Sequence, residues 1–311
     1  MAGKICFGID VGGTTIKCGM FRTDGTVLDK WEIPTRTENG GEQILPDIAA
    51  AVHGRIQVNG FEEKQITGIG IGIPGPVRAG KVPVAVNLHW GEKDVAKELE
   101  ALTGFPVRVA NDANAAAPGE MWKGAGEGRK NVIMITLGTG VGCGVIINEQ
   151  IVEGANGAGG EVGHMHVSDD LDEPCNCGNK GCLEQFCSAT GIARLARVSL
   201  AEHPETESVL RDGKPDAKAV FDAYKEGDAL AESVVREFAD LLGTALSSVA
   251  VVTDPEVIVI GGGVSKAGEV LTDIVGRYYR QKVFSSCAGT PVVLAKLGND
   301  AGIYGAARMV I

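Results

Sequence analysis

A short apolar segment that runs directly into a glycine–threonine turn occurs twice in this chain. Residues 4–10 are apolar and β-branched and lead into DVGGTT, and residues 131–136 lead into TLGTGV. Apolar, β-branched runs that end at glycine predict β-strands. The likeness of the two strand–turn–strand units predicts an internal repeat, with one copy in each of two domains.

The rest of the chain predicts strands that alternate with helices. Strands are expected at residues 16–21, 26–32, 66–73, 107–110 and 256–260, and helices at 44–58, 113–122, most of 189–250 and 301–310. In residues 66–73 isoleucine alternates with glycine, which indicates a buried strand whose backbone is closely approached. This alternation of elements indicates an α/β protein. A length of 311 residues suits two domains, divided near residue 110.

Charge and cysteine usage narrow the classes of partner. Because 29 basic residues face 40 acidic ones, the net charge is −11, which disfavours nucleic acid and anionic membranes as partners. We find no secretory leader and no apolar run of about 20 residues that would cross a bilayer. Eight cysteines are too dilute for a disulfide scaffold, so we expect a reduced, cytoplasmic protein.

Glycine is the residue that departs most from average usage. The chain has 45 glycines without a Gly-X-Y period, which excludes a collagen-like fibre, and many cluster at 12–19, 68–75, 138–144, 154–163 and 261–263. Because glycine lacks Cβ, its backbone N–H groups can bind phosphates closely. The turns at 12–14 and 138–140 are therefore candidate phosphate clamps, and Asp10 is placed to hold Mg²⁺. Two simple hairpin turns are the alternative.

Two common nucleotide motifs are excluded. The chain contains no GxxxxGK[ST] motif, so it is not a P-loop protein. A GxGxxG pattern at residues 70–75 is followed and interrupted by proline, which is incompatible with the helix of a dinucleotide site.

Three cysteines and a histidine form a candidate zinc site. Cys175, Cys177 and Cys182 lie within 19 positions of His164, and Cys₃His is an accepted tetrahedral zinc set. His166 is a competing ligand. Four protein ligands leave no open position, so the zinc is expected to be structural, which argues against a zinc hydrolase. The acidic net charge argues against a zinc ribbon for nucleic acid.

Asp112 is the candidate acid–base residue. It follows a predicted strand and precedes a predicted helix, so it could simply cap that helix. Alternatively, its carboxylate could accept a proton from a substrate hydroxyl, as phosphoryl transfer requires.

Together these segments resemble the ROK family of bacterial sugar kinases and their repressor relatives. The matching motifs are IDVGGTTIK at 9–17, IPGPV at 73–77, ANDAN at 110–114, LGTGVG at 137–142, GEVGH at 160–164 and CNCGNKGCLE at 175–184. The resemblance implies a two-domain actin-like, ribonuclease-H-like ATPase fold with an active-site cleft between the domains. The smaller domain would comprise 1–110 and a C-terminal helix at about 299–311, and the larger would comprise 111–298.

The resemblance also implies roles for individual residues. Asp112 would be the general base. The sugar would be bound by Gly75, Asn111, Asp112, Gly140, Glu161, His164 and Glu184. ATP and Mg²⁺ would be bound by Asp10, Gly12, Gly13, Thr14, Thr15, Lys17, Gly138, Thr139, Gly261, Gly262 and Gly263. A structural zinc on His164, Cys175, Cys177 and Cys182 would order the sugar site. Four of the glycine clusters would then lie at ATP or sugar contacts.

The expected activity is ATP-dependent phosphorylation of a hexose, with glucose first, because residues 184–191 resemble the Gram-positive-type glucokinases of the family. Other hexoses such as N-acetylmannosamine, N-acetylglucosamine or fructose are alternatives, and so is a non-catalytic sugar sensor. A repressor is disfavoured because the first strand starts by about Lys4, which leaves no room for a preceding DNA-binding domain. Family members are expected to form homodimers or homotetramers.

Overall fold

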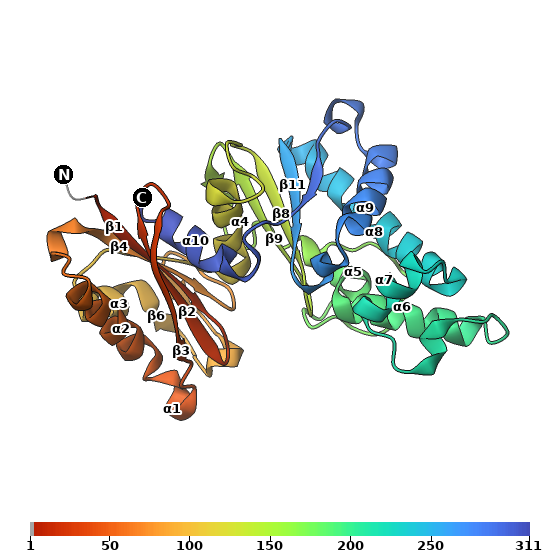
Figure 1. Ribbon diagram of the computed structural model, residues 1–311. Coiled ribbons are helices and arrows are strands. Elements are labelled where there is room, and N and C mark those ends of the chain that lie inside the picture. Colours follow the sequence, from red (N-terminus) through yellow and green to blue (C-terminus); the bar gives the residue numbers. More distant parts are fainter. Residues whose placement is uncertain (1–2) are drawn as a thin grey trace. The chain divides into compact units, whose positions relative to one another are not determined.

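The computed structural model describes residues 3–311, which form two compact units (Figure 1). Unit 1 comprises the described residues up to Gly128, Gly144–Gly159 and Lys296–Ile311, and unit 2 comprises Arg129–Cys143 and Gly160–Ala295. These ranges differ from the expected division at residue 110. Residues 111–128 belong to unit 1 because the helix that they form packs on the C-terminal helix.

Unit 1 is built on a five-stranded sheet. Its order is β3-β2-β1-β4-β7, with β1 Ile5–Val11, β2 Thr15–Arg22, β3 Val27–Pro34, β4 Ile66–Ile73 and β7 Val107–Asn111. The β1–β2 and β2–β3 pairs are antiparallel, whereas the β1–β4 and β4–β7 pairs are parallel. All five strands confirm the sequence predictions to within two residues.

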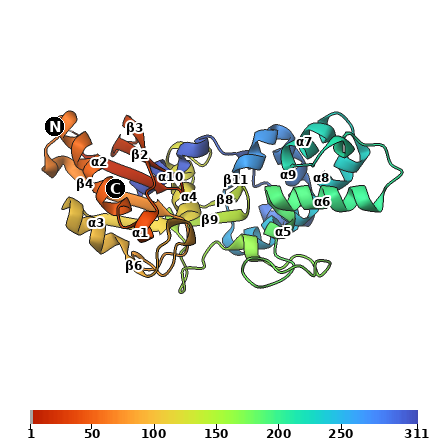
Figure 2. The same cartoon turned by 90° about the horizontal axis from the view of Figure 1, so that it is seen from below.

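Helices cover both faces of this sheet. The helices of unit 1 are α1 Glu38–Gly41, α2 Ile44–Val58, α3 Val95–Thr103, α4 Asp112–Lys123 and α10 Ala301–Arg308, and a small ribbon pairs β5 Lys81–Val82 with β6 Lys93–Asp94. The apolar core lies between the sheet and the pair α2 and α3. On the other face, α10 packs against β1, β4 and α4 (Figures 1 and 2).

Strand β4 shows why the sequence alternates isoleucine with glycine. Successive side chains of a strand point to opposite faces. Ile69, Ile71 and Ile73 enter the core beneath α2 and α3. On the opposite face, a Cβ added at Gly70 would lie 1.7 Å from the carbonyl oxygen of Ala306 in α10. The predicted close approach to this strand is therefore the backbone of a helix, and Gly70 serves packing rather than ligand binding.

The same close packing recurs around α10. A Cβ at Gly8 in β1 would lie 1.8 Å from the Ile303 carbonyl oxygen, and one at Gly305 would lie 1.6 Å from the carbonyl oxygen of Ala115 in α4. Real Cβ atoms do not come this close to backbone atoms, so these positions require glycine. Part of the glycine excess therefore builds the contacts of α10.

The second sheet repeats the topology of the first. Its order is β10-β9-β8-β11-β12, with β8 Val132–Leu137, β9 Val141–Ile147, β10 Gln150–Ile151, β11 Val257–Gly261 and β12 Val292–Leu294. The β9–β10 pair is antiparallel and the β8–β11 and β11–β12 pairs are parallel, as in the corresponding pairs of the first sheet. This order supports the predicted internal repeat. The chain passes from unit 2 into unit 1 within β9.

Helices make up most of the rest of unit 2. They are α5 Glu184–Cys187, α6 Ala189–Glu202, α7 Ala217–Lys225, α8 Ala229–Thr253 and α9 Glu269–Lys282. The sequence patterns predicted the helical region 189–250 but missed α9, and in unit 1 they missed α3. No helix in the described residues is both long and apolar enough to cross a membrane.

A buried carboxylate fixes the segments at which the chain leaves and re-enters unit 1. Glu120 of α4 has an exposed fraction of 0 % and accepts hydrogen bonds from three backbone N–H groups, those of Ala125 at 2.7 Å, Lys296 at 3.1 Å and Leu297 at 2.7 Å. A buried carboxylate needs partners, and these three N–H groups from two segments of the chain supply them.

Replacing Glu120 with alanine should therefore lower the free energy of unfolding by about 3 kcal/mol, because three backbone N–H groups lose their hydrogen bonds to a charged acceptor. The measurement is the shift of the urea unfolding curve. Glu127→Ala is the matched control, because the Glu127 side chain is 61 % exposed and forms a surface ion pair with Lys123 at 3.5 Å. Equal destabilisation by the two variants would contradict this role for Glu120.

Candidate functional site

The first glycine turn of unit 1 is a β-hairpin connection. The N–H of Gly12 donates to the Thr15 carbonyl at 3.0 Å, and Thr35 secures the turn through a 2.7 Å bond from its hydroxyl to the Gly12 carbonyl and a 2.9 Å bond from its N–H to the Thr14 carbonyl. Gly13 and Thr14 are exposed at the tip. The turn is thus a hairpin, as the alternative proposed. Its tip is held by hydrogen bonds and is exposed to solvent next to Asp10.

Asp10 lies on the α10 face of β1. Because Ile9 and Val11 point into the core, Asp10 points to the opposite face, where a Cβ at Gly302 would lie 2.7 Å from its carboxyl carbon. The pKa of Asp10 is raised from 3.8 to about 6, mainly because burial disfavours the charged carboxylate and also because of the negative charge of Asp112, while Lys17 partly opposes the rise. Asp10 lies near the carboxyl end of β1 and Asp112 directly follows β7, two parallel strands with β4 between them, and the charge of Asp112 acts on Asp10.

The start of α4 separates the capping role from the candidate catalytic role. Asn111 is the N-cap residue, and its side-chain oxygen accepts from the N–H groups of Ala113 at 2.9 Å and Asn114 at 3.4 Å. Its amide nitrogen donates to the Gly75 carbonyl at 2.9 Å, where Gly75 has φ +122°. Asn111 therefore makes the capping bonds that the alternative reading assigned to Asp112.

Asp112 is the first residue of α4 and is exposed to solvent on one side. Its carboxylate accepts a bond from the Ala113 N–H at 2.9 Å. The surrounding chain desolvates the carboxyl and raises its pKa, although the bonds from backbone groups and from Asn111 partly oppose this. An accessible carboxylate with a raised pKa at a helix N-terminus suits a general base.

The second glycine turn, in unit 2, is tied to the start of α6. The N–H of Gly138 donates to the Gly140 carbonyl at 3.0 Å, the Ala189 N–H donates to the Gly138 carbonyl at 2.7 Å, and the Thr190 hydroxyl donates to the Thr139 carbonyl at 2.8 Å. Thr139 itself is exposed. The turn therefore presents its outer face from a fixed backbone.

The three glycines at the end of β11, Gly261 to Gly263, differ in how closely other atoms approach them. A Cβ at Gly262 would lie 2.5 Å from the backbone of Leu137, so this residue allows the end of β11 to pack on the end of β8. Gly263 has no neighbour at that distance. It borders a hollow of about 280 Å³ whose apolar walls include Phe221 and Val264.

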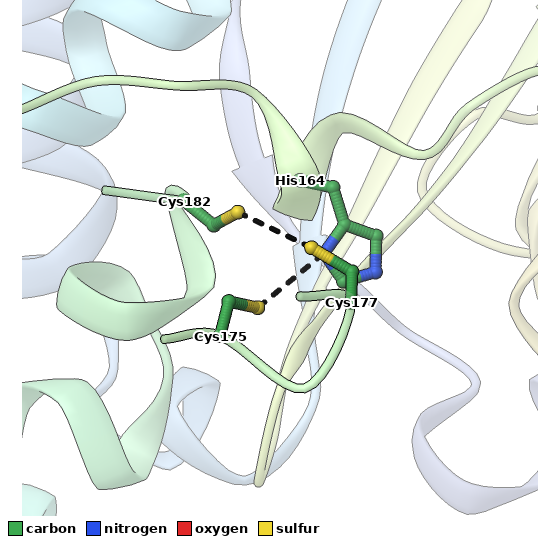
Figure 3. A group of neighbouring side chains, drawn as sticks. All are labelled: His164, Cys175, Cys177 and Cys182. Atoms are coloured by element: carbon green, nitrogen blue, oxygen red, sulfur yellow. Dashed lines mark hydrogen bonds between the residues drawn. The ribbon is translucent and has the colours of Figure 1, made fainter. Parts of the chain in front are cut away.

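The four predicted zinc ligands converge in unit 2 (Figure 3). The imidazole of His164 and the thiol groups of Cys175, Cys177 and Cys182 place their ligand atoms within 4.8 Å of one another. Sγ of Cys175 lies 3.7 Å from Nδ1 of His164, and Sγ of Cys177 lies 3.6 Å from Sγ of Cys182. Three thiols and one imidazole fit a tetrahedral zinc ion.

The competing ligand His166 is directed elsewhere. Its Nδ1 lies 3.0 Å from the Lys180 carbonyl and its Nε2 lies 3.1 Å from the Asp169 carboxylate, so both ring nitrogens have partners outside the cluster. Of the two histidines, His164 is therefore the one whose ring lies with the three thiols.

Two glutamates flank His164. The Glu161 carboxylate lies 3.8 Å from Nε2, and the Glu184 carboxylate lies 3.8 Å from Nδ1 and 3.0 Å from Sγ of Cys175. A Cβ at Gly140 would lie 2.6 Å from a Glu184 oxygen, so the second glycine turn also reaches this group. The structure thus brings Gly140, Glu161, His164 and Glu184 together within unit 2.

The sequence analysis missed Gln185. Its side-chain oxygen accepts from the Cys182 N–H at 3.1 Å, and its amide nitrogen donates to the Glu173 carbonyl at 2.9 Å. Only its position directly after Glu184 could have suggested a role.

Comparison with known proteins gives one consistent result. The ROK family profile matches residues 6–311. A glucokinase of Halalkalibacterium halodurans is 45% identical over 100% of this chain and 96% of its own length. A ROK hexokinase structure from Thermus thermophilus has a TM-score of 0.81 at 32% identity, covering 98% of this chain and 97% of that one. A Streptomyces griseus glucokinase in complex with glucose and AMPPNP has a TM-score of 0.75 at 35% identity, covering 98% of both chains.

The cluster geometry predicts which histidine a metal requires. His164→Ala should reduce the zinc bound per chain after purification and dialysis, because it removes one of four ligands. His166→Ala, two residues along the chain, should retain the wild-type zinc content. Bound zinc can be measured by atomic emission. If the His166 variant lost zinc and the His164 variant kept it, the ligand assignment would be wrong.

The raised pKa of Asp10 predicts a pH-dependent stability cost. The folded protein holds this proton more tightly than the unfolded chain, so stability falls as pH rises from 3.8 to about 6, and the full cost is present above that range. Asp10→Asn should therefore stabilise the protein at pH 7.5 by on the order of 2 kcal/mol, and by less near pH 4.

Urea unfolding at the two pH values measures this difference. Asp24→Asn is the control, because hydrogen bonds from Thr26 lower the pKa of Asp24, so the same change there should not stabilise. A stabilisation of Asp10→Asn that did not grow with pH would contradict the burial argument.

Proposed function

Because the chain belongs to the ROK family, we propose that it is an ATP-dependent hexose kinase that converts glucose to glucose 6-phosphate. The observation that carries the proposal is the start of α4, where Asn111 accepts the capping bonds of the helix and the Asp112 carboxylate remains exposed. If Asp112 were the residue that caps α4, its presence there would be explained without a catalytic role.

Asp112 is the proposed general base. Its carboxylate accepts the proton of the sugar hydroxyl while that oxygen attacks the γ-phosphorus of ATP, and the bond from this phosphorus to the bridging oxygen breaks to release ADP. The raised pKa of Asp112 suits this task because it brings the proton affinity of the carboxylate closer to neutral pH.

The glycine turns are the proposed phosphate contacts. Exposed N–H and hydroxyl groups at Gly13, Thr14 and Thr139 can donate to phosphate oxygens. Asp10 would hold Mg²⁺, which neutralises phosphate charge when bound. The remaining proposed nucleotide contacts are Gly12, Thr15, Lys17, Gly138, Gly261, Gly262 and Gly263. Of the triplet, Gly263 is the best placed, since it borders the apolar hollow that could receive the base.

Carboxylate and imidazole groups are the proposed sugar contacts. Glu161, His164 and Glu184 offer directional acceptors and donors for sugar hydroxyls, and the backbone near Gly75 and Gly140 would add further bonds. Asn111 has a smaller share than the resemblance implies, because its side chain already bonds Ala113, Asn114 and Gly75.

A zinc ion on the cluster would have a structural role in this proposal. Cys175, Cys177, Cys182 and Nδ1 of His164 would occupy all four positions, so the ion has no place for water or substrate. Its effect would be to fix the His164 ring, whose Nε2 remains free to meet a sugar hydroxyl.

Asp112→Asn separates a kinase from a non-catalytic sugar-binding protein. We expect kcat to fall by roughly 10²- to 10⁴-fold, because the amide cannot accept the proton, whereas glucose affinity should be retained. A coupled ADP-release assay measures the first quantity and calorimetry measures the second. Asp112→Glu, which keeps a carboxylate, is the control and should retain more activity than Asp112→Asn. An unchanged kcat in Asp112→Asn would remove the base from the mechanism.

The same assay on glucose, mannose, fructose, N-acetylglucosamine and N-acetylmannosamine tests the substrate. The highest kcat/KM is expected for glucose. Preference for another of these sugars would keep the kinase and change the hexose. Inactivity of the wild-type protein on all five would overturn the kinase proposal.

A further inference from the structure

We propose that Arg194 is a positioning residue that holds both the metal-binding segment, residues 173–182, and the carboxylate of Glu184 in place by acting through Gln185. The part that concerns Glu184 rests on its proposed role in sugar binding. The part that concerns the metal-binding segment is independent of any kinase activity.

Arg194 grips a single backbone oxygen. From α6, its Nε and Nη2 donate to the Gln185 carbonyl at 3.2 and 3.0 Å. Its guanidinium carbon lies 4.8 Å from the centre of the Phe186 ring, so stacking fixes the plane of the group as well. The side chain is half-buried. Two donors and a stacked plane determine both the position and the orientation of the α5 turn.

The side chain of Gln185 connects the turn that Arg194 holds to both ends of the metal-binding segment. Its side chain bonds the Glu173 carbonyl at 2.9 Å and the Cys182 N–H at 3.1 Å, while its own carbonyl is held by Arg194. The segment between these two points carries Cys175 and Cys177. The ends of a metal-binding loop are thus set by one residue that is itself held from α6.

Glu184 directly precedes Gln185 and shares its turn. Its carboxylate lies 3.0 Å from Sγ of Cys175 and 3.8 Å from Nδ1 of His164. A Cβ at Gly191 would lie 2.6 Å from the Phe186 carbonyl carbon, so α6 lies directly against the α5 backbone. Because Glu184 belongs to the turn that Arg194 holds against α6, a shift of this turn after loss of the Arg194 bonds would also displace the Glu184 carboxylate.

Arg197 provides a matched control. It lies three residues along α6, is exposed, and borders the same hollow of about 310 Å³ as Glu184 and Arg194. Among the described residues, no hydrogen bond or ion pair of its side chain is found. The two arginines therefore share helix, charge and neighbourhood, and differ in whether they hold the turn.

The test compares zinc-loaded wild type with Arg194→Met, Arg194→Lys and Arg197→Met. For Arg194→Met we expect the glucose KM to rise roughly 10- to 100-fold, because a charged hydrogen-bond donor is lost, with the ATP KM unchanged. Zinc transfer to a chromogenic chelator should be faster by a similar factor. Arg194→Lys should recover part of both losses, since an ammonium group can still donate to the Gln185 carbonyl. Arg197→Met should match wild type.

Several results would overturn the proposal. Arg194→Met could behave like Arg197→Met in zinc retention and glucose KM, or its ATP KM could rise as much as its glucose KM, which would indicate a general structural defect. If Arg194→Met does not fold, Gln185→Met gives the decision, because it removes both side-chain bonds to the segment and leaves Arg194 intact. It should show the same two losses, and wild-type behaviour would contradict the proposal.

The zinc readout separates this inference from the proposed function. If wild type phosphorylates no hexose, the kinase proposal fails, yet faster zinc transfer in Arg194→Met than in Arg197→Met still supports the positioning of the segment. If wild type is an active kinase but the two variants transfer zinc and bind glucose alike, only the positioning proposal fails.

Discussion

Unit 1 depends on the close contact between α10 and the glycine face of its sheet. A Cβ added at Gly8, Gly70 or Gly305 would lie less than 2 Å from a backbone carbonyl oxygen of α10 or α4. The contact fixes α10 between the sheet and α4, and α4 carries both Asp112 and the buried carboxylate of Glu120. The positions of Asp10, which lies against α10, and of Asp112 therefore depend on a packing arrangement that only glycine permits.

The sequence predicted those helices and strands whose apolar residues recur at helical or strand spacing within the segment itself. The strands of the first sheet and the helix at 44–58 were found because their side-chain alternation is complete within the segment. The true use of Gly70 was missed because it depends on a helix distant in the chain. Helix α9 was missed although Leu271, Ile274, Val275 and Tyr279 have helical spacing, so the sequence did contain its signal. The sequence shows that a residue is glycine, but it does not show whether a phosphate or the backbone of a helix approaches it.

The candidate site shows the same division. Residue chemistry and spacing were enough to nominate Asp112 and the three cysteines. They could not decide between His164 and His166, because both lie at suitable spacing, and the decision came from the bonds of His166 to Lys180 and Asp169. Nor could they show that Asn111 supplies the helix cap, which is the bond that leaves Asp112 available.

The alternating strand β4 also has a consequence for the order of folding. On its glycine face Gly72 packs against Ala115 of α4, whereas Gly70 packs against the backbone of Ala306, so the part of the face around Gly70 stays open to water until residues 301–308 are added as α10. More than two hundred residues must be synthesised between the two. The sheet of unit 1 therefore cannot complete its packing until residues 301–308 have been synthesised.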